Sequence, residues 1–131
     1  MASNGATLRQ RSELLLKAEK DLKKVKSSPK ASEDEKKYIA DQKTTAQDDL
    51  NDIVDSIKDE EVLVLNTMEE VKAFIGLHST YFAEGKRGSL KKVEIGSVGS
   101  VGSNDTKRKM WAILESAGFK VSNPSLTFTF P

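Results

Sequence analysis

The stretch "KKVKSSPKASEDEKKY", residues 23–38, decides how the first half of the chain folds. Pro29 cannot continue a helix, so a helix that precedes this stretch must end within it. Three residues further on, Ser32 and Glu35 have the S-x-x-E spacing of a capping box, which predicts that a second helix begins here. Two helices joined by so short a turn usually fold back on each other in antiparallel fashion.

Apolar residues recur at spacings of three, four and seven on both sides of this turn. They are Leu8, Leu15, Ala18, Leu22 and Val25 before it, and Ile39, Ala46, Leu50, Ile53, Val54 and Ile57 after it. The pattern predicts a coiled-coil-like helical hairpin over residues 1–60, whose first helix runs from about 7 to 27. Its apolar seam is thin, because Arg11, Lys36 and Lys43 interrupt it. We therefore expect the hairpin to self-associate or to dock on the second half of the chain.

The second half, residues 61–131, has the pattern of a small α+β lobe, which makes the whole chain a helix-rich α+β protein. "VLVL", residues 62–65, is either a short strand or the last turn of the preceding helix, and we favour the strand. Thr67 and Glu70 form a second capping box, and a helix is predicted over about 67–83. A strand over residues 90–95 follows.

The end of the lobe is predicted as a helix followed by two strands. The helix begins at Asn104 or Asp105 as its cap and ends at Gly118. The strands form a hairpin on either side of a turn at residues 123–125. If the last of them, "LTFTF", lies at a sheet edge, it can pair with a second molecule.

Between the 90–95 strand and this helix lies a Gly/Ser loop, residues 96–103, with the sequence GSVGSVGS. Its glycines follow the pattern G-x-x-G-x-x-G, which is neither the dinucleotide fingerprint nor the phosphate-binding loop of nucleotide hydrolases. We interpret it as a mobile loop, in which Val98 and Val101 are the residues best suited to contact a partner.

Composition excludes several classes of protein. The chain has 131 residues and no cysteine, so disulfides, thiolate catalysis and cysteine-bound zinc are excluded. It has no apolar run near the roughly 20 residues of a membrane span and no signal peptide, so we expect no membrane contact and a cytoplasmic or otherwise intracellular, not secreted, protein. The net charge of +1 is unevenly divided: +5 over residues 1–30, −9 over 31–70 and +5 over 71–131. Blocks of opposite sign can attract one another within or between chains.

Four aspartates form a stripe on the second predicted helix, about 200° from its apolar seam, and should face outward. They are Asp48, Asp52, Asp55 and Asp59. The stripe is either a solvated face or a docking face for a basic partner. Carboxylates spread along a single helix cannot converge on one ion, so we expect no metal site here.

Basic residues of the second half cluster in two places, which are candidates for binding nucleic acid if the fold brings them together. They are Lys86, Arg87 and Lys91 after the 67–83 helix, and Lys107, Arg108 and Lys109, beside Trp111, at the start of the next helix. His78 is the only histidine and lies on an apolar stripe without a recognisable nucleophile and acid around it. No catalytic residues and no cofactor are therefore predicted.

These observations favour a non-enzymatic assembly or interaction protein, of nucleocapsid-like or scaffold-like type, which forms a homo-oligomer through the hairpin and the lobe. The alternative is an accessory protein that binds nucleic acid through the basic residues of the lobe.

Overall fold

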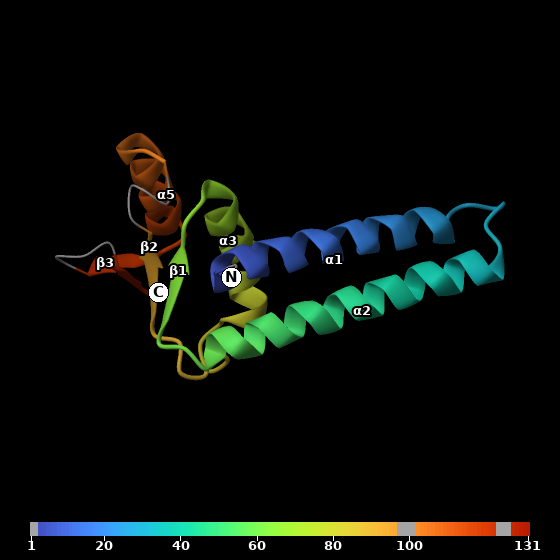
Figure 1. The fold of residues 1–131 in the computed structure, drawn as a ribbon, viewed down its shortest axis with the longest axis horizontal. Helices are drawn as coiled ribbons and strands as arrows, with labels where there is room; N and C mark the ends of the chain where they lie inside the picture. Colours follow the sequence, from blue (N-terminus) through green and yellow to red (C-terminus); the bar gives the residue numbers. More distant parts are fainter. Residues whose placement is uncertain (1–2, 97–101, 123–126) are drawn as a thin grey trace.

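The chain folds into a long two-helix arm and a small α+β lobe at one end of it (Figure 1). The computed structural model describes residues 3–96, 102–122 and 127–131. Helix α1 (Asn4–Lys26) and helix α2 (Glu33–Lys58) lie antiparallel, as the proline and the capping box between them predicted. The helix-rich α+β class is confirmed.

Both long helices begin at a serine cap. The Ser32 hydroxyl oxygen accepts a hydrogen bond from the Glu35 N–H at 3.1 Å, which confirms the predicted start of α2. Helix α1 begins three residues earlier than predicted, because the Ser3 hydroxyl accepts from the Ala6 N–H at 3.2 Å. The apolar repeat first becomes visible at Leu8, so the first turn of α1 carries no periodic signal.

The lobe is a mixed sheet with helices between its strands. Its elements are β1 (Val62–Leu65), α3 (Met68–Tyr81), β2 (Lys92–Ile95), α5 (Asn104–Ser116), β3 (Lys120–Ser122) and β4 (Thr127–Thr129). The strand order is β1-β2-β4-β3, where β1 and β2 are parallel and the other pairs antiparallel. Residues 62–65 are thus a strand, because they pair with β2 over their whole length.

Two details of the lobe correct the predictions. The last strand does not lie at an edge: β4 is enclosed by β2 and β3, and β3 is the edge strand instead. The cap of α5 is Ser103, whose hydroxyl accepts from the Thr106 N–H at 3.1 Å, rather than Asn104 or Asp105, which already belong to the helix. Most of the predicted mobile loop, including Val98 and Val101, lies outside the described residues.

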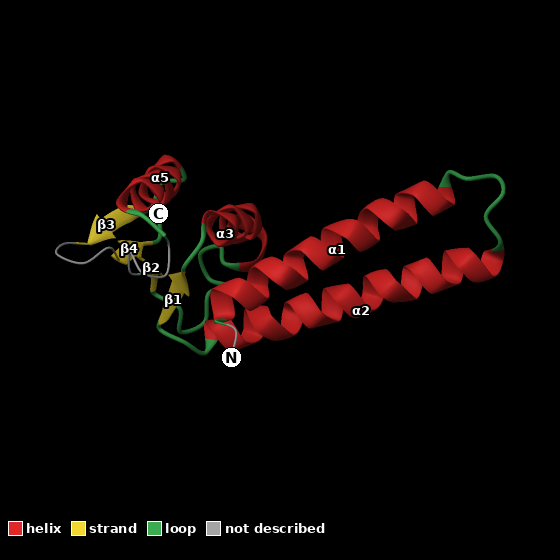
Figure 2. Cartoon of the chain, turned by 45° about the horizontal axis from the view of Figure 1, so that its top comes forward, coloured by secondary structure: helices red, strands yellow, loops and turns green. Residues whose placement is uncertain are grey.

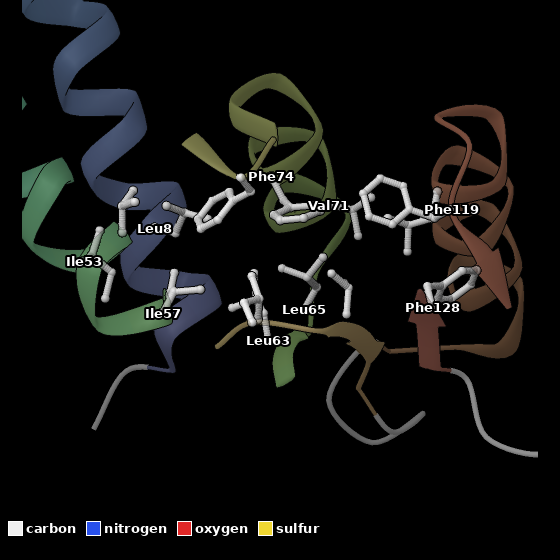
Figure 3. Packing of buried hydrophobic residues seen from close by; sticks show 14 of the residues in the cluster. Leu8, Ile53, Ile57, Leu63, Leu65, Val71, Phe74, Phe119 and Phe128 are labelled. Carbon is white, nitrogen blue, oxygen red and sulfur yellow. The ribbon is translucent and has the colours of Figure 1, made fainter. Parts of the chain in front are cut away.

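A single apolar core joins the lobe to the base of the arm. Figure 2 shows α3 and α5 on the same side of the sheet, the side on which Leu63, Val93 and Phe128 are fully buried. Figure 3 shows the core continuing from these residues through α3 to Leu8, on α1, and to Ile57, on α2. The hairpin therefore docks on the second half of the chain, as its thin seam suggested, but only over its base.

The arm and the lobe approach each other closely at Gly5, in the first turn of α1. A Cβ at this position would lie 2.6 Å from the carbonyl oxygen of Val64 and 2.7 Å from Oε1 of Glu70. Glu70 is only 3% exposed, and its Oε1 has no hydrogen-bond partner among the described residues. The first turn of α1 thus rests directly on β1 and on a buried carboxylate, an approach that only glycine allows.

Substitution at Gly5 should therefore destabilise the protein. We expect Gly5→Ala to lower the free energy of unfolding by about 1–3 kcal/mol, because the added methyl forces backbone and buried atoms apart. Gly76 is the matched control: it lies inside α3, and a Cβ there would meet nothing within 4 Å. Gly76→Ala should raise the free energy of unfolding by up to about 1 kcal/mol. Urea unfolding measures both, and a Gly5→Ala variant as stable as the wild type would contradict the close contact.

Candidate functional site

The arm, residues 3–61, projects beyond the lobe over most of its length (Figures 1 and 2). A hollow of about 340 Å³ lies between α1 and α2 in the middle and outer part of the arm. We call it the arm groove. Its lining residues are Leu14, Lys17, Ala18 and Asp21 from α1, and Tyr38, Ile39, Asp41, Gln42, Thr45, Ala46 and Asp49 from α2.

Large apolar side chains are exposed in this part of the arm. Leu14 and Tyr38, which line the groove, are 51% and 62% exposed. Leu16, at 62%, lies about 200° round α1 from Leu14 and so faces away from the groove. The outer seam residues Leu22 and Val25 are only half-buried, whereas Leu8 and Leu50 at the base are fully buried. The arm therefore leaves apolar surface uncovered where the lobe does not reach.

The two helices of the arm carry opposite charge. Helix α1 has seven basic and three acidic residues, whereas α2 has four basic and eight acidic ones. At the inner end of the groove the Arg11 guanidinium crosses between the helices and donates to the backbone carbonyl of Asp49 at 2.8 Å. In the lining of the groove itself, α2 contributes Asp41 and Asp49, whereas α1 contributes Lys17 and Asp21, whose charges cancel.

The aspartate stripe lies where the periodicity placed it. Asp48, Asp52, Asp55 and Asp59 are all exposed, and none of the four carboxylates forms an ion pair within the part of the chain that the structure describes. The described residues also contain no group of three or more histidines, cysteines or carboxylates placed to hold a metal ion. The stripe is therefore an exposed acidic surface beside the groove, and its carboxylates form no ion pairs among the described residues.

The basic residues of the lobe fall into two separate groups. Lys86, Arg87 and Lys91 precede β2, whereas Lys107, Arg108 and Lys109 lie on α5, which starts after the opposite end of the same strand. The fold therefore brings each group together but places the two at opposite ends of the sheet (Figure 1).

Several of these side chains have partners within the lobe. The Arg87 guanidinium lies 4.3 Å from the centre of the Phe130 ring, and Lys109 forms an ion pair with Asp105 at 3.2 Å. Trp111 is half-buried, stands edge-on against Phe128, and donates its indole N–H to Glu115. The aromatic neighbour expected for nucleic-acid binding thus packs against the core of the lobe.

His78 belongs to an aromatic cluster. Its ring stacks on Phe130 with a centroid separation of 5.5 Å and lies 4.9 Å from that of Phe119. Burial, and secondly the positive charge of Arg87, lower the pKa of His78 below its usual 6.5. The histidine is therefore held neutral among aromatic rings at neutral pH.

This shift predicts a pH dependence of stability. Because the folded protein binds the His78 proton less readily than the unfolded chain, the contribution of His78 is complete above about pH 6.5 and is lost as the pH falls toward its lowered folded pKa. Proton NMR follows the titration directly, since the chain has one histidine. We expect a midpoint below 6.5 in the wild type and a higher midpoint in Arg87→Gln. A wild-type midpoint at or above 6.5 would refute this account.

Comparison of the chain with models of protein families, with curated proteins and with solved structures found no match. Among the described helices, none combines the length and the apolar character needed to cross a membrane.

The sequence reasoning had missed the exposed residues of the groove. It assigned Leu15 to the seam but gave no role to Leu14, Leu16 or Tyr38. A signal was present, because three consecutive leucines span about 200° of a helix surface and cannot all fit a narrow seam.

Proposed function

We propose that this is an assembly protein that self-associates through its arm, so that the arm groove receives the arm of a second copy. The observation that carries the proposal is the exposure of Leu14 and Tyr38 over a groove that the lobe leaves uncovered (Figure 2). A two-helix arm can bury one seam only. Two arms packed together form a four-helix bundle, in which the flanks of the seam are buried as well.

Burial of apolar surface favours a second arm as the occupant of the groove. Complete burial of a large apolar side chain contributes about 1.5–3 kcal/mol. In a twofold dimer each groove residue is buried twice, so Leu14 and Tyr38 together supply four buried side chains. The half-buried seam residues Leu22, Val25 and Ile39 add further apolar contact along the same bundle.

Charge complementarity also selects a second copy as the partner. A twofold axis that runs parallel to the arms brings their groove faces together and places α1 of each copy against α2 of the other. Because α1 is basic overall and α2 is acidic overall, this arrangement brings helices of opposite net charge together. The proposed role is non-enzymatic: the arms join the copies, and each lobe is left as a second surface for contacts.

Nucleic-acid binding by the lobe stays a prediction from the sequence. The separation of its two basic groups by the sheet, and the packing of Trp111 and Arg87 against phenylalanines, give it no further support.

Paired leucine substitutions test the proposal. Leu14→Glu places a charge in the groove, and Leu16→Glu places the same charge on the opposite flank at a leucine that is no less exposed. We expect a wild-type dimer in sedimentation equilibrium and a dissociation constant about 100-fold higher or more for Leu14→Glu, since two leucines leave the interface. Leu16→Glu should change it by less than about threefold.

Circular dichroism establishes that both variants remain helical. A monomeric wild type at high micromolar concentration would overturn the proposal, and so would equal weakening by the two substitutions. An oligomer that forms only when an oligonucleotide is added, and that Leu14→Glu leaves intact, would favour the nucleic-acid alternative instead.

A further inference from the structure

The outer end of α1 and the turn that follows it carry a concentration of positive charge. Residues 17–30 contain six lysines and two carboxylates, which gives this segment a net charge of +4. All six lysines are exposed, and none forms an ion pair within the described part of the chain. They are Lys17, Lys20, Lys23, Lys24, Lys26 and Lys30. Figure 1 shows this end of the arm as the part of the described chain that lies farthest from the lobe.

Four of these lysines share the side of α1 that faces away from α2. Lys20 and Lys24 each lie two residues from the seam residue Leu22, so both are about 200° round the helix from it. Lys17 and Lys23 stand on either side of this pair, and the four side chains together span about 120° of the helix surface. We call these four residues the lysine face.

No carboxylate of the outer end of α1 lies within the lysine face. Asp21 lies beyond one of its edges and lines the arm groove. Glu19 lies beyond the other edge, one turn before Lys23, and forms no ion pair with it among the described residues. Glu13, one turn nearer to the lobe, is already neutralised by Arg9 at 3.1 Å. The positive charge of the lysine face is therefore not compensated within the arm.

The dipole of α1 accounts for only part of this charge. Cations stabilise the C-terminus of a helix, but the effect falls off within the last turn. Lys23, Lys24 and Lys26 lie in that turn, whereas Lys17 and Lys20 lie before it. Like charges at spacings of three and four repel one another along a helix. The lysine face thus slightly destabilises its own helix, and a bound polyanion would remove that cost.

A chain of phosphates fits the lysine face better than a membrane surface does. Lysines that neutralise phosphates of a nucleic acid release its condensed counterions, which drives binding without base contacts. The face includes one large exposed apolar side chain, Leu16, whereas a helix that lies in a membrane interface buries a whole apolar side. It includes no aromatic ring on which a base could stack. The partner is therefore recognised through its phosphates alone.

The base of the arm would repel the same partner. Residues 48–61 contain seven carboxylates and one lysine, which gives a net charge of −6, and they include the aspartate stripe. A polyanion is consequently attracted to the outer end of α1 and kept away from the end that joins the lobe.

We propose that the lysine face binds the phosphate backbone of a nucleic acid, independently of base sequence. This site is distinct from the two basic groups of the lobe, to which the sequence had pointed. It also goes beyond the proposed self-association and does not depend on it, because Lys20, Lys23 and Lys24 are not part of the lining of the arm groove.

A triple substitution tests the lysine face. The variant that combines Lys20→Gln, Lys23→Gln and Lys24→Gln removes three charges and leaves the groove lining unchanged. Fluorescence anisotropy with a labelled DNA duplex of about 20 base pairs measures the association constant over a series of salt concentrations. We expect an affinity at least about tenfold lower at roughly 50 mM salt, and a dependence of log K on log salt that is less steep by about 2–3.

An equal loss of charge on the lobe is the matched control. The variant that combines Lys107→Gln, Arg108→Gln and Lys109→Gln should change the affinity by less than about threefold. Circular dichroism establishes that both variants remain helical.

Three outcomes would overturn the inference. The first is a wild type that does not bind the duplex at low salt, and the second is a lobe variant that loses as much affinity as the lysine-face variant. The third is a wild type that binds vesicles of anionic lipid and not the duplex, which would assign the lysine face to a membrane surface. A monomeric wild type that binds the duplex through the lysine face would overturn the proposed self-association alone.

Discussion

The contact between the first turn of α1 and β1 determines where the arm stands on the lobe. At Gly5 the helix backbone approaches the Val64 carbonyl so closely that no side chain fits between them. The neighbouring Leu65 carbonyl accepts the Gly96 N–H, so the Val64 carbonyl points away from β2, toward the outer edge of the sheet. Helix α1 therefore covers this edge, which would otherwise be open to strand pairing, and from there the arm leads away from the sheet (Figure 1).

The same contact explains the position of Glu70. Its backbone N–H takes part in the predicted cap, donating to the Thr67 hydroxyl at 3.1 Å, but its side chain is buried against Gly5. A buried carboxylate oxygen without a hydrogen-bond partner is costly. Its place at the N-terminus of α1, where the helix dipole is positive, offsets part of that cost. The carboxylate of Glu70 thus favours this position of the arm on the lobe over alternative positions that would bury similar apolar surface.

This attachment gives the arm two different halves. Its base shares the core of the lobe through Leu8, Ile53 and Ile57, so it needs no other partner. Beyond this base each helix of the arm has only the other helix to pack against, and Leu14 and Tyr38 stay exposed to solvent. The proposed self-association would cover this outer part of each arm in a four-helix bundle.

The sequence by itself determined the elements of this protein, because they depend on local physical chemistry. Pro29 and the cap at Ser32 fixed the hairpin, and periods of seven, 3.6 and two fixed the helices and most of the strands, as well as the outward direction of the aspartate stripe. Only the tertiary structure decided that β4 lies inside the sheet, that the two basic groups of the lobe are apart, and that Gly5 meets Glu70. These relations join residues far apart in the chain, and the order of strands leaves no trace in their alternation. The groove depends on both the sequence and the tertiary structure. The three consecutive leucines indicate that α1 has more apolar surface than a narrow seam can bury. Which of these leucines lines the groove with Tyr38 depends on the rotation of each helix about its own axis.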